Sequence, residues 1–352
     1  MFSRTIQNRE DSKSNHKEEP VLNDTRQNMW RALPFVMAML LTTLIPLNAY
    51  ALFGSKKAAE QSAPQGAPIA QNLEIKAYRG VPYTGTLKAI DNEGEAVTFR
   101  LAALPAKGTL EFGEEGVFVY TPEPNKAGSD SFTYTAVDES GNESAPATVK
   151  IKIERVSSGV NYADTAPECA TAAVDLAEKG VLIGTKVGGD WFFEPERTVS
   201  RGEFVAMAMA ATGLQTSDVT VTGFCDDAAI PTWAKGSAAG ALSAGIVRGV
   251  RTEKGVAYNA QADMTLSEAA AVLDRILQVT DVDLTDFDET EPVWYAQAVA
   301  NLESVSIAPV GGYEAEALSH ALTRGEAAEL LSSAMALAEA REANTSLWDK
   351  IF

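Results

Sequence analysis

The feature that most constrains the fold of this chain is a pattern that recurs three times in its C-terminal half. An aromatic residue stands two positions before an acidic residue at Tyr162-Ala163-Asp164, Phe224-Cys225-Asp226 and Phe287-Asp288-Glu289. The starts of these motifs are 62 and 63 residues apart. Self-similarity at a fixed period indicates supersecondary units that stack to bury a shared core. We therefore expect three similar units, at residues 160–216, 222–280 and 285–341.

Each unit is predicted to contain a first helix, and the first two of these helices end at a glycine. Ala-rich stretches follow the three starts, at residues 169–179, 233–244 and 294–304. Glycine pairs follow the first two stretches, namely Gly180 with Gly184 and Gly245 with Gly249. A glycine just past a helix supplies the left-handed residue of a C-cap. The third unit departs from this pattern, with Ser306 and Val310 at the glycine positions.

A second helix is predicted in each unit from a capping box. A hydroxyl residue is followed three positions later by Glu at Ser200 with Glu203, Thr265 with Glu268 and Thr323 with Glu326. In such a box each of the two side chains accepts a hydrogen bond from the backbone of the other residue. Helix initiation alone therefore explains these six residues.

Arginine stands inside two of the three boxes, where helix initiation does not explain it. Arg201 and Arg324 lie in a first helical turn, and the helix macrodipole disfavours a cation there. The second unit has Leu266 at the same position. Free amides, a positive helix end and a guanidinium fork together make a good receptor for a carboxylate. An ion pair within this acidic region and a bound anion are both open explanations.

Residues 67–156 show a different pattern, in which short strands alternate apolar and polar residues. The clearest alternation covers residues 97–101, 116–120, 131–137 and 147–153. About seven such strands predict an antiparallel β-sandwich. Four loop carboxylates suit either a calcium site or the capping of loop amides, and capping is the more common role. They are Asp91, Glu93, Asp130 and Asp138.

The N-terminal segment is predicted to be an export signal. An apolar run covers residues 32–47, and small residues follow it up to Ala51. This run is short for a spanning helix, and the small-residue pattern is the kind that signal peptidase cleaves after. We expect a leader and signal at residues 1–51, cleavage after Ala51, and a linker at residues 52–66. A retained signal anchor and a start at Met29 are the alternatives.

Charge and the few Cys and His residues exclude several classes of function. Residues 1–156 hold 17 basic and 19 acidic residues, whereas residues 157–352 hold 12 and 29. Phosphate backbones and anionic lipids repel so acidic a surface, so we expect no nucleic-acid partner and no membrane partner after cleavage. With two Cys and two His residues, we expect no cofactor, no metal site and no catalytic residue. Cys169 and Cys225 either form a disulfide or remain two small buried side chains.

Residues 160–341 resemble the S-layer homology (SLH) domain family, as three consecutive repeats. The aromatic-x-Asp start, the Gly-x-x-x-Gly after the first helix and the Thr-Arg-x-Glu helix start carry the resemblance. It implies a mostly α-helical, pseudo-threefold bundle with ligand grooves between neighbouring repeats. It also implies a secondary cell-wall polysaccharide as the ligand, commonly bearing pyruvate ketals, bound by the motif Arg.

The resemblance assigns particular residues to these grooves. Arg201 is the first choice, because its repeat keeps the Arg and both glycines, and Arg324 is the second. Leu266 predicts a weak groove or none. Trp233 and Trp294 are candidates for stacking on sugar rings, although core packing is the more common role of such residues. The implied ligand-binding set also includes two capping glutamates and the two glycine pairs: Glu203, Glu326, Gly180, Gly184, Gly245 and Gly249.

Residues 67–156 resemble the bacterial immunoglobulin/cadherin-like repeat family of surface proteins. Three motifs carry this resemblance: Pro105-x-x-Gly108-Thr109-Leu110, Phe118-x-Tyr120-Thr121-Pro122 and Gly128-x-Asp130-x-Phe132-x-Tyr134. It implies a spacer or adhesive module.

The whole chain is therefore predicted to be a multidomain α+β protein, with a β-sandwich, a helical bundle and a tail at residues 342–352. We expect a secreted, non-catalytic cell-surface protein that binds a wall polysaccharide or a peptidoglycan-linked glycan. A structural part of an S-layer lattice, a tether between outer membrane and peptidoglycan, and a wall-anchored hydrolase are the alternatives.

Overall fold

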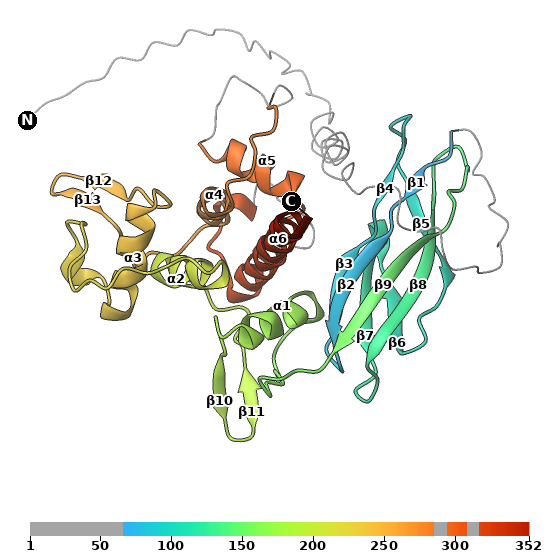
Figure 1. Ribbon diagram of the computed structural model, residues 1–352, viewed down its shortest axis with the longest axis horizontal. Coiled ribbons are helices and arrows are strands. Elements are labelled where there is room, and N and C mark those ends of the chain that lie inside the picture. The colour runs from blue at the N-terminus through green and yellow to red at the C-terminus, as the bar shows by residue number, and fades with distance from the viewer. Residues whose placement is uncertain (1–65, 285–293, 308–316, 352) are drawn as a thin grey trace, which may run out of the picture.

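The computed structural model describes residues 66–284, 294–307 and 317–351 (Figure 1). These residues form a mixed α+β structure in which a β-sandwich precedes a group of helices. The predicted signal, its cleavage site after Ala51 and most of the linker lie outside the described residues, as does the Phe287 start of the third unit.

The β module consists of two packed sheets and a small two-stranded sheet of β1 and β4. A four-stranded sheet has the order β2-β9-β8-β5 and a three-stranded sheet has the order β3-β7-β6. Its strands are β1 (Ile69–Ala70), β2 (Leu73–Tyr78), β3 (Tyr83–Thr86), β4 (Ala89–Ile90), β5 (Thr98–Ala103), β6 (Gly108–Phe112), β7 (Val117–Pro122), β8 (Gly128–Val137) and β9 (Ala147–Glu154). A single turn of 3₁₀ helix, η2 (Glu114–Gly116), precedes β7.

The predicted sandwich is confirmed, with one correction to its strand directions. β2 pairs with β9 in parallel, whereas the other pairs are antiparallel. The parallel pair joins the two ends of the module, so the rest of the sandwich serves as the long crossover that parallel strands need. Period-two alternation places Phe118 and Tyr120 of β7, with Phe132 and Tyr134 of β8, in the buried core.

The first two units of the helical part each contain a helix, a short hairpin and a second helix, and the described residues of the third contain two α-helices. The first unit contains α1 (Pro167–Glu178), β10 (Thr185–Val187), β11 (Asp190–Phe192) and α2 (Arg201–Ala211). The second contains η3 (Asp227–Ala229), α3 (Thr232–Ser243), β12 (Val250–Thr252), β13 (Gly255–Ala257) and α4 (Leu266–Leu277). The third contains α5 (Ala296–Ser304), η4 (Ala317–Ser319) and α6 (Arg324–Ile351).

Three backbone hydrogen bonds join the units in a closed ring. The amide of Val199 donates to the carbonyl of Leu322 at 2.8 Å, and the amide of Leu322 donates to the carbonyl of Met264 at 2.6 Å. Met264 closes the ring by donating to Val199 at 2.9 Å. All three residues are buried, and each directly precedes the hydroxyl of a capping box. The three box regions therefore occupy equivalent places around one centre.

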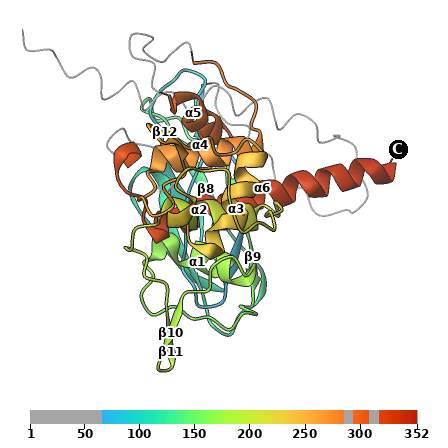
Figure 2. The ribbon, with the colours of Figure 1, turned by 90° about the vertical axis from the view of Figure 1, so that its left-hand side faces the viewer.

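The C-terminal helix is longer than expected. A boundary at residues 341/342 was predicted, but α6 continues without a break to Ile351. Gly325 lies in its first turn, and the rest of the helix contains neither Gly nor Pro, so nothing in the sequence stops it. Figure 2 shows the end of α6 projecting away from the other helices.

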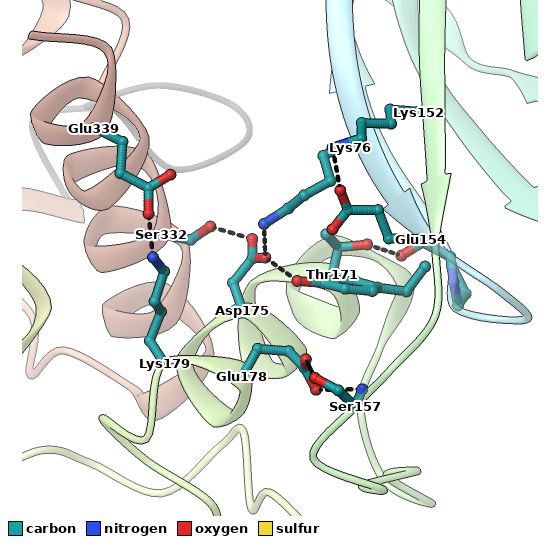
Figure 3. A network of polar contacts seen from close by, with 12 residues as sticks. Lys76, Lys152, Glu154, Ser157, Thr171, Asp175, Glu178, Lys179, Ser332 and Glu339 are labelled. Atoms are coloured by element: carbon teal, nitrogen blue, oxygen red, sulfur yellow. Dashed lines mark hydrogen bonds and ion pairs between the residues drawn. The ribbon is translucent and has the colours of Figure 1, made fainter. Parts of the chain in front are cut away.

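A buried polar junction connects the β module to the helices (Figure 3). Asp175 of α1 accepts hydrogen bonds from the hydroxyls of Tyr78 in β2, at 2.8 Å, and Ser332 in α6, at 2.6 Å. Its carboxylate also pairs with the ammonium of Lys76 at 2.6 Å. Thr171 donates to the carbonyl of Pro82 at 2.8 Å. One carboxylate thus holds a strand of the sandwich and two helices together.

Candidate functional site

The acidic residue of the first and second repeat starts caps the backbone of a distant loop. Asp164 accepts hydrogen bonds from the amides of Phe193, at 2.8 Å, and Glu194, at 2.7 Å. The second unit repeats both contacts at 2.8 Å, from the amides of Tyr258 and Asn259 to Asp226. Glu194 and Asn259 both have a positive φ, +58° and +57°. The Asp therefore stabilises a left-handed backbone conformation that residues other than glycine adopt only with strain.

Arg324 begins α6 at the loop that Asp164 fixes in the first unit. Its amide donates to the carbonyl of Arg197 at 2.8 Å, and the next amide, of Gly325, donates to Pro195 at 2.9 Å. Its guanidinium lies 5.1 Å from the centre of the Phe193 ring. The Arg324 side chain is only 7% exposed, so it is a buried cation between the third and first units.

The charge of Arg324 is poorly balanced. Its Nη1 atom lies 3.5 Å from a carboxylate oxygen of Glu194, the long limit of an ion pair with that half-exposed side chain. Its Nε and Nη2 atoms are buried and have no hydrogen-bond partner among the described residues. Burial, and then the nearby charge of Arg197, lowers the pKa of Arg324 from its usual value. Unpaired buried donors of this kind are costly, so an entering acceptor stabilises them.

Two cavities open beside Arg324. The first, of about 410 Å³, is lined by Arg324 and residues 180–185. Gly180 and Gly184 both have a positive φ, as the predicted C-cap requires. A Cβ atom on Gly184 would lie 2.4 Å from the carbonyl oxygen of Phe192, so only glycine fits there. The backbone that forms this wall of the cavity is therefore fixed by its glycines.

The second cavity adds an aromatic side chain and a second arginine. It has a volume of about 250 Å³, and its lining includes Arg324, Arg197, Glu203 and Trp233. Trp233, at the start of α3, is 60% exposed. Such an exposed indole beside a guanidinium offers a flat apolar face next to a positive charge.

Arg201 is placed like Arg324 but is neutralised. Its amide donates to the carbonyl of Ala262 at 2.8 Å, which repeats the contact that Arg324 makes with Arg197. Its guanidinium, however, pairs with Glu268 at 2.5 Å, and both side chains are largely buried. Arg201 lines neither of the two cavities. The geometry therefore favours Arg324 over Arg201, which was the first choice from the sequence.

The third interface holds Leu266, which is 1% exposed and belongs to the helical core. An apolar side chain therefore fills the place that arginine occupies at the other two interfaces.

The structure contains the three predicted capping boxes. The hydroxyls of Ser200, Thr265 and Thr323 each accept from the amide of the box Glu, and each box carboxylate accepts from the amide of the hydroxyl residue. Each box glutamate also has a basic partner, and for two of them it precedes the same box: Arg197 for Glu203 and His320 for Glu326, whereas Glu268 pairs with Arg201 of another unit. Arg197 and His320 stand three positions before the box hydroxyl, a regularity that could have been found in the sequence.

The remaining candidate residues, Gly245, Gly249 and Trp294, do not line either cavity. Gly245 and Gly249 are left-handed, as expected of C-caps in the second unit. Trp294 is 65% exposed and packs edge-on against Tyr295, with ring centres 5.5 Å apart, outside both cavities.

The two cysteines are free thiols, so the disulfide is absent from the structure. Cys169 is buried in α1, and burial raises the pKa of its thiol to about 11. Cys225 is exposed and therefore does not match the buried alternative either.

The loop carboxylates of the β module cap backbone amides. Asp130 accepts from the amides of Ala106 and Lys107, at 3.0 and 2.8 Å, and Asp138 accepts from Asn142 at 2.7 Å. Within the described residues, no group of three His, Cys, Asp or Glu side chains is arranged to hold a metal ion. Nor does any helix in that part of the chain have the length and apolar character needed to cross a membrane.

Solved structures similar to this chain match only part of it. An endo-fucoidan hydrolase of glycoside hydrolase family 107, MfFcnA4, is 23% identical over 27% of this chain and 15% of that chain, with a TM-score of 0.22. The SrpA adhesin of Streptococcus sanguinis is 22% identical over 32% and 66%, with a TM-score of 0.21. The D00-D0 domain of intimin is 13% identical over 27% and 50%, with a TM-score of 0.21. This chain thus spans less than two thirds of each of these structures.

The family comparison agrees with the fold of the β module. No curated protein matches the chain. The family model of the bacterial cadherin-like domain matches residues 63–155, which contain both sheets of the sandwich. Residues 63–155 are accordingly a bacterial cadherin-like domain.

Proposed function

We propose that this protein is a non-catalytic cell-surface protein whose residues 160–341 anchor it to an acidic wall polysaccharide. The buried, incompletely paired Arg324 beside two open cavities is the observation that carries this proposal. The SLH resemblance of the repeats supports a secondary cell-wall polysaccharide as the ligand. The cadherin-like domain would then be displayed from this anchor as a spacer or adhesive unit.

The groove offers complementary groups for one acidic sugar. A ketal carboxylate of the polymer would accept charge-assisted hydrogen bonds from the guanidinium of Arg324. The exposed ring of Trp233 would stack on the apolar face of the sugar. The left-handed glycines, Gly180 and Gly184, carry no side chain, so a sugar ring can approach the backbone at these two positions of the cavity wall.

The acidic charge of the chain makes this recognition selective. Residues 157–352 carry 12 basic and 29 acidic residues, so an anionic polymer is repelled by most of the surface. Binding would therefore depend on one or two local positive groups, with many weak sites along the polymer giving avidity at the wall.

Sedimentation with wall sacculi tests the proposal. Purified residues 52–352 should pellet with sacculi that carry the secondary polymer and remain in solution with acid-stripped sacculi. Arg324→Ala should reduce the bound fraction about tenfold, because it removes a charge-assisted contact. Arg251→Ala, on the exposed β12–β13 hairpin, is the charge-matched control. Equal pelleting with stripped walls would point to peptidoglycan, and no pelleting would refute the anchor.

A further inference from the structure

Two interfaces between the units are built alike, so their residues can be compared directly. Arg324 and Arg197 at one interface correspond to Arg201 and Ala262 at the other, because the same amide-to-carbonyl bond of 2.8 Å joins each pair. At one interface two nitrogen atoms of Arg324 are unpaired and two cavities lie beside it, whereas at the other Arg201 forms a short ion pair and, among the described residues, only its Nε atom is unpaired. The difference between the two must therefore come from the side chains around them.

The capping glutamate has a different partner at each interface. Glu268 pairs with Arg201 at 2.5 Å. Its counterpart, Glu203, lies close enough to Arg324 for its charge to act on that guanidinium, and both line the second cavity. Glu203 nevertheless pairs with Arg197 and not with Arg324. The capping glutamate thus neutralises the arginine at one interface, whereas the equivalent glutamate at the other interface does not pair with Arg324.

The residue three positions before the box hydroxyl explains this difference. Arg197 occupies that position in the first unit and draws Glu203 toward itself. Ala262 occupies it in the second unit and carries no charge that competes for Glu268. Both side chains are exposed, so exchanging them leaves the core untouched.

We propose that Arg197 is a positioning residue that keeps the Arg324 groove open to an anion by holding Glu203 in a competing ion pair. At the Arg201 groove, Ala262 cannot compete for Glu268, so Glu268 pairs with Arg201 and closes that groove to an anion. A carboxylate ligand at the Arg324 groove then meets an arginine whose one ion pair among the described residues is with the loosely held Glu194, 3.5 Å away. This inference rests on the proposed function, since it needs an anion to bind at Arg324.

Calorimetric titration with a hexose glycoside that bears a pyruvate ketal tests it on residues 52–352. Arg197→Ala should weaken binding about tenfold, because Glu203 becomes free to pair with Arg324. Arg197→Lys should restore most of the affinity by keeping a cation beside Glu203. The double variant Arg197→Ala with Glu203→Gln should also restore it, because Gln maintains the capping box without a charge.

The converse substitution, at Ala262, should open the Arg201 groove to an anion. Ala262→Arg is expected to pair with Glu268, release Arg201 and raise the binding stoichiometry from one to two. Ala210→Arg, at the exposed end of α2, adds the same charge away from the interface and should leave the stoichiometry at one.

The outcomes separate this inference from the proposed function. No binding by the unsubstituted protein would refute the proposed function itself. Binding that Arg197→Ala leaves unchanged would overturn the role of Arg197 alone. Weak binding in the double variant would also overturn it, because Arg197 would then contact the ligand directly. A stoichiometry of one for Ala262→Arg would contradict the expectation that the new arginine takes Glu268 away from Arg201.

Discussion

Glu194 illustrates how one residue can limit a binding site. Its amide is held by Asp164 with a positive φ, while its half-exposed side chain is the close counter-charge of Arg324. The equivalent residue of the second unit is Asn259, which has the same backbone conformation without a charge. A carboxylate ligand at Arg324 would therefore meet repulsion from Glu194 that a neutral amide would not exert.

Glu194→Gln should tighten the binding of the pyruvylated glycoside about threefold, because it removes this like charge and retains a polar side chain. Isothermal titration of the two proteins measures the change. Glu196→Gln, an exposed neighbour two positions along, is the control and should bind like the unsubstituted protein. Weaker binding by Glu194→Gln would mean that the carboxylate helps to hold the ligand.

The difference between Arg201 and Arg324 shows that the neutralisation of a guanidinium depends on residues far away in the sequence. Their boxes read alike, and the sequence therefore predicted both as candidates. The partner that neutralises Arg201 is Glu268, which is 67 residues away along the chain. No local pattern reports such a pairing. The C-cap glycines and capping boxes were predicted correctly because their contacts lie within one turn of the helix that they begin or end.

At the scale of the elements, the helices and their caps could be predicted, whereas the short hairpins could not. β10 and β11 have three residues each, too few for an alternating pattern to be recognised. The parallel pairing of β2 with β9 depends on strands that are far apart in sequence. The length of α6 was not predicted, because residues 342–352 were treated as a separate tail although no Gly or Pro in them stops a helix.

The loop before α3 supplies a prediction about pH. The hydrogen bond from Lys235, followed by those from Thr222, lowers the pKa of Asp227 from 3.8 to about 2. A carboxyl group with a lowered pKa in the folded state stabilises the fold above its unfolded pKa. That contribution is lost as the pH falls from about 4 through about 2.

Asp227→Asn should therefore lower the melting temperature at pH 7 and reduce its dependence on pH between about 4 and 2. Thermal unfolding followed by circular dichroism at a series of pH values measures both effects. Asp190→Asn, on the exposed β10–β11 hairpin, serves as the control. An identical acid-induced decrease in the Asp227→Asn variant would show that the ion pair contributes nothing to stability.

At the scale of the whole molecule, the sandwich and the helices are joined by more than the connecting chain. Asp175 bridges β2 and α6, and the ammonium of Lys88 donates to the hydroxyl of Ser306 at 2.6 Å as a second contact. Tyr78 also packs with Val160 and Val174 in a small apolar cluster. These contacts join the cadherin-like domain directly to α1 and α6.

Asp175→Ala should destabilise the protein by roughly 2 kcal/mol, because it leaves the buried hydroxyl of Tyr78 and the half-buried hydroxyl of Ser332 without their acceptor. Differential scanning calorimetry should show one cooperative transition for the unsubstituted protein and a lower or divided transition for the variant. Asp190→Ala is the matched control at an exposed carboxylate. Two separate transitions in the unsubstituted protein would show that the two parts unfold independently.

The most direct test of the account is a crystal structure of residues 52–352 with the pyruvylated glycoside. The account predicts that the ketal carboxylate lies against the guanidinium of Arg324, within the cavities lined by residues 180–185 and Trp233, while Arg201 keeps its ion pair with Glu268. A glycoside bound at Arg201 or on the cadherin-like domain, with an empty Arg324 groove, would contradict it.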